Sequence, residues 1–420
     1  MKKLIINIIF IFLIKFSISQ ETIKIMSYNL LNFGNITSYC TEQNNNYITK
    51  TGYLRTIIEN QQPDILAVCE LKNSTQFPVY ILGNALNVNG ETRWARTDFT
   101  NIAGSPLVNC LFYDKNKFII DTLIPAVTTS VRDINIYRLK HKNSGTYFHV
   151  VIAHLKAGST DAISRGEMVT AFMNRLNQYH DKTNNFIIVG DFNVYSSAEP
   201  AFQNLINPTN NEIAFFDPIN KIGAWNNNNT YKNYFTQSTH NTESNGCAAS
   251  GGFDDRFDFI LLSSSILNNT KKMKYINNSY WAVGQDGNRF NNNLISPDNT
   301  TLPSDVINAL YNMSDHLPVV AEFQFENITN IESSSTNNQF YVIIQNPIKN
   351  QLNFNIKIDS PKQLTVSLYS IVGNKIIEKN IFAEQNFGYS FDINNLKSGI
   401  YILIFEGDGI FKSYKIMIEQ

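Results

Sequence analysis

The chain has no excess of basic residues. Its 420 residues include 34 lysines and arginines and 35 aspartates and glutamates, which give a formal net charge of −1 at pH 7. This balance excludes a bulk polycation. If the protein acts on nucleic acid, a local basic cleft and a metal ion must hold the phosphates, because the overall charge does not attract them.

Signatures of several hydrolase classes are also missing. The sequence contains no H-E-x-x-H motif and no C-x-x-C pair, which argues against a zinc hydrolase. It contains no G-x-S-x-G nucleophile elbow and no phosphate-binding P-loop. A catalytic serine triad is not favoured, because no motif in the sequence points to a nucleophilic serine with its histidine and acid partners.

Only four cysteines are present, Cys40, Cys69, Cys110 and Cys247. They allow up to two disulfides in an oxidising compartment, but the sequence does not give the connectivity. Cys69 and Cys110 lie inside strand-like apolar runs and also fit buried thiols.

Long apolar runs are missing after the first 20 residues. The segment MKKLIINIIFIFLIKFSISQ begins with two lysines, continues through an apolar stretch and ends in small residues. This layout is typical of a cleaved secretory signal peptide, and an uncleaved anchor helix is the less favoured alternative. Cleavage removes three lysines and leaves a net charge of about −4. We expect an exported monomer with no stable membrane span after this cleavage.

A series of apolar runs fills the region between about residues 22 and 326. Each run is rich in Ile, Val, Phe and Leu and is bounded by turn formers, as expected of strands. The stretch TGYLRTIIENQQ predicts a helix, and so does ISRGEMVTAFMNRLNQYHDK, where Met168, Phe172, Leu176 and Tyr179 recur at three- and four-residue steps. This mixture favours sheets with helices packed outside.

The end of the chain has a different character. Residues 329–339 are polar, small and without periodicity, so we expect a linker. From 340 to 420, short alternating strands punctuated by glycines predict a small all-β sandwich. The predicted organisation is a signal peptide at 1–20, a catalytic domain at 21–328, the linker, and this C-terminal domain.

Polar residues occur at the ends of the apolar runs that are predicted to be strands. Side chains at one rim of a sheet can converge on a single point. Carboxylates bind a hard cation such as Mg²⁺, a further carboxylate takes a proton from water, and histidines stabilise charge on a phosphate. The pattern therefore favours metal-assisted phosphoester hydrolysis. The residues concerned are Asn29, Glu70, His154, Asp191, Asn193, Asp258, Asp315 and His316.

Six motifs occur in order along the chain: SYNLLNF, DILAVCEL, AHLKAG, VGDFNVY, DDRFDFILLS and SDHLPVV. Together they resemble the endonuclease/exonuclease/phosphatase superfamily over about residues 22 to 326. The resemblance implies a deoxyribonuclease I-like fold, which is an α/β four-layer sandwich of two mixed sheets with helices outside. It also implies Mg²⁺ as the cofactor, with Mn²⁺ or Ca²⁺ as alternatives.

The resemblance also implies roles for the matching carboxylates and amides. Glu70 resembles the metal-binding glutamate, with Asn29 beside it at the metal or the phosphate. Asp315 resembles a metal ligand or proton acceptor. Asp191 matches the residue that orients or deprotonates the attacking water, and Asn193 matches its phosphate-contacting neighbour.

The matching histidines have distinct implied roles. His316 resembles the phosphate-stabilising histidine, oriented by Asp258, and His154 resembles a second histidine that is a general acid in some members. Arg165 is a weaker match, and its implied role is contact with the phosphate. Outside the motifs, the expected surface or packing histidines are His141, His149, His180 and His240.

The C-terminal block resembles the sorting domain of the type IX secretion system, through NPIKNQLNFNI, VSLYSIVGNKI and LKSGIYILIFEGDGIFKSYKIMI. This resemblance implies that the secretion machinery is a partner. A substrate-binding sandwich is the alternative, but Tyr401 and Phe405 alternate as core residues do. We expect a secreted or cell-surface protein that is exported through the periplasm.

The sequence thus predicts a secreted phosphodiesterase that cuts DNA or RNA. The insert from about Trp225 to Gly252 carries aromatic and basic residues that suit single strands, and Arg93, Arg96 and Arg132 suit a basic cleft. The alternatives are a sphingomyelinase-like phospholipid hydrolase, a phosphomonoesterase and a non-enzymatic surface protein. A membrane-active relative would expose an apolar hairpin, and the segment YINNSYW, 275 to 281, is too polar for one.

Overall fold

The computed structural model describes residues 21–178, 185–209, 213–241, 246–326, 340–344, 346–358, 360–384, 387–408 and 410–419. The predicted signal peptide and linker lie outside these residues, as do Tyr179 and His180 at the end of the second predicted helix. The chain divides into two compact units, Met1–Asn327 and Ile328–Gln420, and each is described by itself. Within the described residues, no helix combines the length and the apolar character needed to cross a membrane.

The first sheet of the N-terminal unit has seven strands and is mixed. Its strands are β1 (Thr22–Phe33), β2 (Ile65–Lys72), β3 (Trp94–Arg96), β4 (Leu107–Asp114), β11 (Met273–Tyr275), β12 (Trp281–Ala282) and β13 (Val319–Phe325). Their order is β11-β13-β1-β2-β4-β3, with β12 also paired to β13. Since β1 pairs with β2 in parallel and with β13 antiparallel, β1 runs through the interior of the sheet.

The second sheet has six strands and is mixed as well. Its strands are β5 (Phe118–Val127), β6 (Ile134–His141), β7 (Tyr147–Ile152), β8 (Asn185–Asp191), β9 (Phe215–Phe216) and β10 (Asp258–Ser263). Their order is β5-β6-β7-β8-β10-β9, and β7 and β8 are its parallel pair. β8 therefore lies between β7 and β10 in the middle of the sheet.

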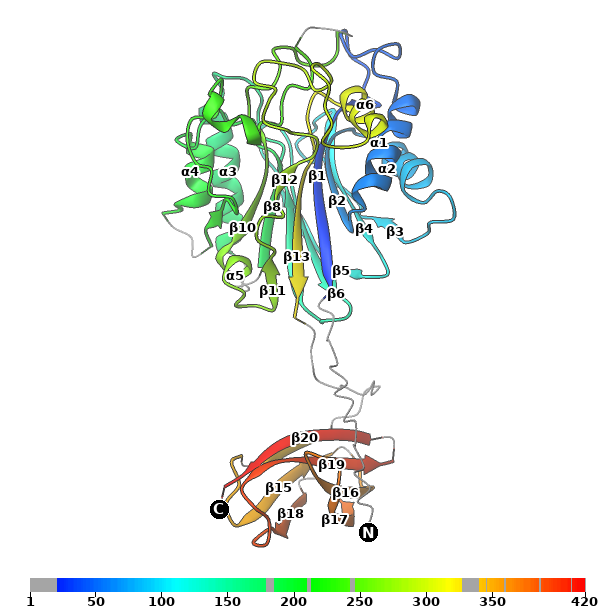
Figure 1. The fold of residues 1–420 in the computed structure, drawn as a ribbon, viewed down its shortest axis with the longest axis vertical. Helices are drawn as coiled ribbons and strands as arrows, with labels where there is room; N and C mark the ends of the chain where they lie inside the picture. The colour runs from blue at the N-terminus through cyan, green and yellow to red at the C-terminus, as the bar shows by residue number, and fades with distance from the viewer. Residues whose placement is uncertain are drawn as a thin grey trace, which may run out of the picture. The chain divides into compact units, whose positions relative to one another are not determined.

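Helices cover the outer faces of the two sheets (Figure 1). The helices beside the first sheet are α1 (Tyr47–Gln61), α2 (Gln76–Ile81), the π-helical turn η1 (Leu82–Leu86) and α6 (Ser304–Met313). Those beside the second sheet are α3 (Ala162–Asn177) and α4 (Pro200–Ile206). Two short elements, the 3₁₀ turn η2 (Asn229–Tyr234) and α5 (Ser264–Leu267), lie in the connections before and after β10. The predicted four-layer α/β sandwich is confirmed.

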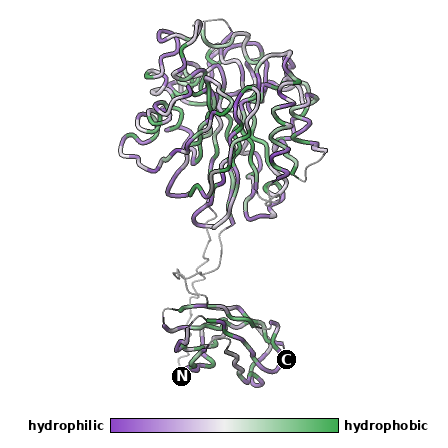
Figure 2. Tube along the Cα trace, turned by 180° about the vertical axis from the view of Figure 1, so that it is seen from behind, coloured by the Kyte–Doolittle hydropathy of each residue, from purple (hydrophilic) through white to green (hydrophobic). Residues whose placement is uncertain are grey.

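Three apolar clusters fill the spaces between these layers. The central cluster joins Ile25 of β1, Val150 of β7 and Ile260 of β10, so it lies between the sheets. One outer cluster packs α1 and α6 on the first sheet, and the other packs α3 and α4 on the second. Figure 2 shows the hydrophobic stretches concentrated along the strands inside the unit.

Both predicted helices are present, as α1 and α3. The side chain of Asn46 accepts hydrogen bonds from the N–H groups of Ile48 and Thr49, which caps α1, and α1 ends before the left-handed Gln62. In α3, Met168, Phe172 and Leu176 are buried against the second sheet, since a spacing of four residues puts them on one face.

The C-terminal unit is all β. Its strands are β14 (Tyr341–Ile344), β15 (Gln351–Lys357), β16 (Lys362–Ser370), β17 (Lys375–Ala383), β18 (Phe387–Asp392), β19 (Gly399–Gly407) and β20 (Ile410–Ile418). They form a three-stranded sheet, β14-β15-β18, and a four-stranded sheet, β17-β16-β19-β20. Alternate residues of β15 are buried in a shared core. Phe405 is buried in this core and Tyr401 packs beside it, as predicted.

Candidate functional site

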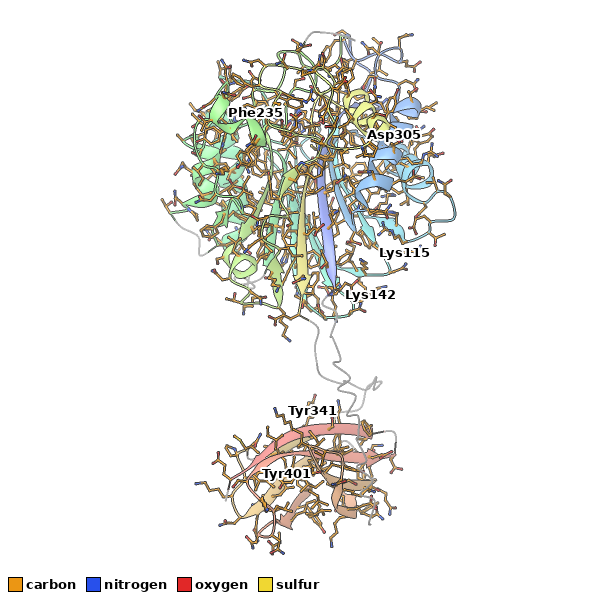
Figure 3. All side chains as sticks on the ribbon, viewed as in Figure 1. Lys115, Lys142, Phe235, Asp305, Tyr341 and Tyr401 are labelled. Atoms are coloured by element: carbon orange, nitrogen blue, oxygen red, sulfur yellow. A yellow bond between two sulfur atoms is a disulfide. The ribbon has the colours of Figure 1, made fainter. Side chains whose placement is uncertain are left out.

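The candidate site lies at the edge of the sandwich where strands of both sheets end. Asp191, the last residue of β8, pairs with Asp258, the first residue of β10. In the first sheet, Asn29 pairs with Cys69, so Glu70 follows one residue later. Figure 3 shows Phe235 near the loop-rich end of the unit, and Lys115 and Lys142 at the other end.

Two local features shape this edge. The register of β2 shifts around Glu70 against both of its neighbours, and a bulge of this kind redirects a side chain. Gly190 has a φ of +133°, and a side chain there would collide with the carbonyl oxygen of Ala153. The glycine therefore allows β8 to pass close to β7 next to Asp191.

Asn29 connects the carboxylates of the two sheets. Its Nδ2 donates to Oε1 of Glu70 over 3.1 Å and to Oδ2 of Asp191 over 3.0 Å. The amide is buried, and its Oδ1 accepts a hydrogen bond from the N–H group of Leu31. Asn29 thus fixes the distance between two carboxylates that would otherwise repel each other.

His154 stands against the same two carboxylates. Its Nε2 lies 3.7 Å from Oε1 of Glu70 and 3.7 Å from Oδ2 of Asp191. Burial lowers the pKa of His154 well below 6.5, and the positive charges of Arg132 and His316 lower it further. Its ring is therefore neutral near pH 7, with a lone pair available to a ligand.

Asp191 is buried at the centre of the cluster. Burial raises its pKa to about 7, the charge of His316 lowers it, and the charges of Asp258 and Glu70 raise it. The N–H group of Asn193 donates to its Oδ1 over 3.0 Å, and Nδ2 of Asn193 donates to the carbonyl of Leu155. Asn193 therefore holds Asp191 beside the loop that follows His154.

His316 has the opposite charge preference to His154. Its Nδ1 lies 2.7 Å from Oδ2 of Asp258, and its Nε2 lies 3.7 Å from Oδ2 of Asp191. Burial lowers the pKa of His316, but the surrounding carboxylates outweigh this effect and hold it well above 6.5. The site thus contains one neutral and one protonated histidine.

Asp315 is held by the loop that covers His316. Its Oδ2 accepts hydrogen bonds from the N–H group of Ala249 over 2.9 Å and from Nε2 of Gln237 over 3.3 Å. Its Oδ1 is buried and has no hydrogen-bond partner among the described residues. A buried carboxylate oxygen in this state has a lone pair available for a cation or a bound water.

Arg165 has different neighbours from those that the sequence implied. It is fully buried, its Nε donates to Glu199 and its Nη2 also lies against this carboxylate, while its Nη1 donates to the carbonyls of Lys156 and Gly158. These two carbonyls belong to the loop that follows His154. The contacts fit a side chain that supports this loop rather than one directed at a phosphate.

The predicted basic cleft and stacking residues are mostly engaged elsewhere. Arg93 pairs with Asp114, Asp64 and Glu91, and Arg96 pairs with Asp98. Arg132 is the arginine near the site, because it donates to the carbonyls of His154 and Leu155.

Within the insert, Phe235 and His240 are buried, so neither ring is exposed for stacking on a nucleic acid, and His240 is a packing histidine as expected. His240 stacks on Tyr311 instead. Tyr231, Lys232 and Tyr234 are half-buried. Packing also explains His141, which stacks on Phe325, and His149, which stacks on Phe186.

Sequence reasoning missed Gln237. Its Nε2 lies 2.7 Å from Nε2 of His316, and its backbone pairs with both Asp255 and His316. No motif or composition signal distinguishes it from other polar loop residues. Gln237 reaches the site because its loop, which is distant in sequence, folds over His316.

A disulfide joins Cys40 to Cys247 and ties this loop to the segment after β1. Cys69 and Cys110 are buried free thiols. Cys247 inside the insert was a usable signal, but its pairing with Cys40 was not readable from the sequence.

The residues present fit a divalent cation. The ligand atoms of Glu70, His154 and Asp191 lie within 4.8 Å of one another. Carboxylate oxygens are the ligands that Mg²⁺, Mn²⁺ and Ca²⁺ prefer, and a neutral imidazole widens the choice of metal. This group shares Glu70 with the ligands that the sequence implied. Asn29 bonds to two of its members, and Asp315 is not in the group.

The C-terminal unit matches a known protein family. Residues 343–419 match the family described as the secretion system C-terminal sorting domain, which confirms the predicted type IX sorting domain. No curated protein matches the chain.

Several solved structures are similar to this chain. The human Nocturnin catalytic domain with bound sulfate anion is 17% identical, covers 73% of this chain and 95% of its own, and has a TM-score of 0.47. An endonuclease/exonuclease/phosphatase family protein from Bacteroides thetaiotaomicron is 13% identical over 73% of this chain and 99% of its own, with a TM-score of 0.45. D. rerio TDP2 complexed with single strand DNA product is 13% identical over 72% of this chain and 98% of its own, with a TM-score of 0.47.

At these identities the likenesses concern the fold alone. The chain joins a four-layer α/β sandwich unit to a secretion system C-terminal sorting domain.

Proposed function

We propose that the N-terminal unit is a metal-dependent phosphodiesterase that hydrolyses the phosphodiester bonds of DNA or RNA. One observation carries the proposal: Glu70, His154 and Asp191 meet the buried pair of His316 and Asp258 at one edge of the sandwich. Chemistry on a phosphate ester needs a cation site, a base for water and a group that neutralises charge, and this edge offers candidates for all three.

The cation site in this proposal is formed by Glu70, Asp191 and His154. Mg²⁺ is the first choice because two of the three ligands are carboxylates, and Mn²⁺ or Ca²⁺ are the alternatives. A bound cation supplies Lewis-acid polarisation of the phosphate and acidifies bound water. Asn29 orients both carboxylates, and the unpaired oxygen of Asp315 is a further acceptor for the ion or for its water.

Asp191 is the proposed base for the attacking water. In the metal-free protein, burial raises its pKa to about 7, which makes it a stronger proton acceptor than an ordinary aspartate. A bound cation would lower this pKa and keep the carboxylate ionised near neutral pH. The N–H group of Asn193 donates to Oδ1 of Asp191 and so fixes the orientation of the carboxylate. In this proposal the Asn193 side chain contacts the phosphate once the substrate displaces its bond to Leu155.

His316 is the proposed phosphate-binding group and proton donor. Its raised pKa keeps the ring protonated, and Asp258 fixes its orientation through Nδ1. The water oxygen bonds to phosphorus as its proton passes to Asp191. The bond from phosphorus to the leaving sugar oxygen breaks, and His316 gives that oxygen its proton. A phosphate that approaches Nε2 replaces the amide of Gln237 there.

His154 receives a different role from the one that the resemblance implied in some members. A histidine whose pKa lies well below 6.5 is neutral near pH 7 and lacks the acidic imidazolium proton that a general acid donates. We therefore assign His154 to the cation and not to the leaving group. Arg165 is assigned to support of the loop after His154, because its guanidinium bonds to Glu199, Lys156 and Gly158.

A nucleic-acid substrate is favoured over a phospholipid by the segment from Tyr275 to Trp281. Tyr275 ends β11 and is 8% exposed, and Trp281 begins β12, which pairs with β13. The segment is thus built into the first sheet rather than projecting as an apolar hairpin. We further propose that the sorting domain sends the unit to the cell surface or the medium, as expected for a signal peptide at 1–20.

A panel of phosphate esters tests the proposed function. Supercoiled plasmid, single-stranded RNA, sphingomyelin and p-nitrophenyl phosphate are incubated with the purified full chain and Mg²⁺, with EDTA and His316→Ala as negative controls. Cleavage of plasmid or RNA that both controls abolish is expected. Cleavage of sphingomyelin or of p-nitrophenyl phosphate alone would replace the nuclease proposal with the corresponding alternative, and no cleavage at all would favour a non-enzymatic surface protein.

A further inference from the structure

A lysine is buried beneath the candidate site. Lys50 of α1 is 3% exposed, and its Nζ donates to the carbonyls of Leu30 and Leu31 and to Oδ1 of Asn45, each over 2.7 Å. The three protons of the ammonium group therefore meet three oxygens. Within the described part of the chain, Lys50 has no carboxylate at ion-pair distance. A buried cation is costly to desolvate, so a specific role is expected for it.

The oxygens that Lys50 binds belong to a turn at the end of β1. Leu31 and Asn32 have φ values of +46° and +49°, a left-handed conformation that Asn tolerates but that is unfavourable for a bulky residue such as Leu31. Such a conformation persists only where the surroundings hold it. Lys50 is one restraint, and Asn45 is another, because its Nδ2 donates to the carbonyls of Leu31 and Asn32.

The same turn holds two residues of the candidate cation site. The N–H group of Leu31 donates to Oδ1 of Asn29 over 2.9 Å, and that of Asn32 donates to Oε2 of Glu70 over 2.8 Å. The carbonyls of the turn therefore face Lys50 while its N–H groups face the site. Because a peptide N–H and the carbonyl of the same turn move together, loss of Lys50 would shift both donors.

The positive charge of Lys50 also helps to hold the acidic side chains of the candidate cation site together. Burial lowers the pKa of Lys50 to about 7, while the charges of Asp315 and Glu70 raise it. The ammonium group is thus electrostatically coupled to the acidic cluster from the opposite side of the turn. A positive charge there reduces the repulsion among carboxylates that must stay together before a cation arrives.

We infer that Lys50 is a positioning residue for the cation site: by holding the left-handed turn at Leu31 and Asn32, it presets Asn29 and Glu70 for metal binding. This inference rests on the proposed metal-dependent function. A lysine that only stabilised the fold would affect the melting temperature but not the affinity of the folded protein for metal.

The test measures Mg²⁺ binding to metal-free full-length protein by isothermal titration calorimetry, with melting temperature followed by circular dichroism. Lys50→Met keeps the length of the side chain and removes the ammonium group. The matched control is Lys24→Met, because Lys24 lies near the start of β1, far along the strand from Asn29, and it donates to the carbonyl of Gln61 and pairs with Glu322. We expect Lys50→Met to raise the Kd for Mg²⁺ at least tenfold, and Lys24→Met to leave it within twofold of wild type.

The outcomes separate the two proposals. If the wild-type protein binds no Mg²⁺, Mn²⁺ or Ca²⁺, the proposed function fails. If wild type binds and folded Lys50→Met binds with the same Kd, the inference about Lys50 is wrong. Should Lys50→Met not fold, Asn45→Ala replaces it, since this change removes one acceptor of Lys50 and two bonds to the turn. A Kd at least threefold above wild type supports the inference, and an unchanged Kd overturns it.

Discussion

Nδ1 of His316 and Oδ2 of Asp258 lie 2.7 Å apart in a fully buried pair. Asp258 pairs across the second sheet with Asp191, so the orientation of the imidazole depends on the same two strands that carry the proposed base. The position of His316 therefore depends on the same strand pairing that positions Asp191.

Removal of His316 should abolish hydrolysis, whereas neutralisation of Asp258 should only weaken it. We expect His316→Ala to lower kcat by about 10²–10⁴-fold, the usual contribution of a general acid or base. Asp258→Asn should lower kcat less, because the ring remains but loses the carboxylate that keeps it protonated. Initial rates on the cleaved ester at saturating Mg²⁺ measure both effects.

His149→Ala is the matched control, because His149 is also buried but stacks on Phe186 in the second sheet. It should lower the melting temperature and leave kcat within about twofold. Equal losses of kcat in His149→Ala and His316→Ala would show that burial of a histidine, and not its chemistry, explains the effect.

Metal removal should act on activity and stability together. A ligand that binds only the folded state stabilises it by about 2.7 kcal/mol at a concentration of 100 times the Kd. EDTA should therefore abolish hydrolysis and lower the melting temperature, and excess Mg²⁺ should restore both. Glu70→Gln should lose most of the Mg²⁺-dependent rise in melting temperature, whereas Glu167→Gln, an exposed change on α3, should retain it. A full response in Glu70→Gln would exclude Glu70 as a ligand.

The raised pKa of Asp191 makes the stability of the metal-free protein depend on pH. Burial raises this pKa from 3.8 to about 7, so the folded state binds the proton more tightly than the unfolded state. The resulting stabilisation is complete below pH 3.8 and is lost as the pH rises to about 7.

Asp191→Asn removes this dependence. Because 1 kcal/mol corresponds to about 2–4 °C in proteins of this size, we expect the metal-free variant to melt roughly 5 °C or more above wild type at pH 8. The gain should be smaller at pH 5, and activity should be lost at both values. Thermal scans in EDTA at the two pH values measure this. A gain that is the same at pH 5 and pH 8 would contradict the assigned shift.

Much of the fold and the neighbourhood of the site could be predicted from the sequence. Asn29, Glu70, Asp191, Asp258 and His316 each end or begin an apolar run, so they could be located at strand ends without coordinates. Polar residues at such positions are unusual enough to stand out against a buried strand. Their order along the chain then carried the resemblance to a known fold.

The parts that could not be predicted depend on loops that fold back from a distance. Gln237 lies 79 residues before His316, yet their side chains touch. Arg165 and Lys50 are both on helices, and nothing in a helical pattern shows that a cation is buried on carbonyls of another segment. Such contacts depend on tertiary structure, which local periodicity does not encode.

The disulfide between Cys40 and Cys247 gives the last prediction. Close to Cys247, the N–H group of Ala249 donates to Oδ2 of Asp315, while Leu31 and Ala248 pack around the two sulfurs. The covalent bond thus restrains the loop that covers Asp315 and His316. A native disulfide of this kind typically contributes about 2–5 kcal/mol.

Cys247→Ser should lower the melting temperature by several degrees and kcat/KM by about tenfold, because Asp315 loses a fixed donor. Dithiothreitol should have the same effect on wild type and on Cys110→Ala, which leaves the disulfide intact, but should not affect Cys247→Ser further. Rates and thermal scans with and without reductant distinguish these cases. If reduced wild type keeps its full rate while its melting temperature falls, the disulfide stabilises the unit without positioning the site.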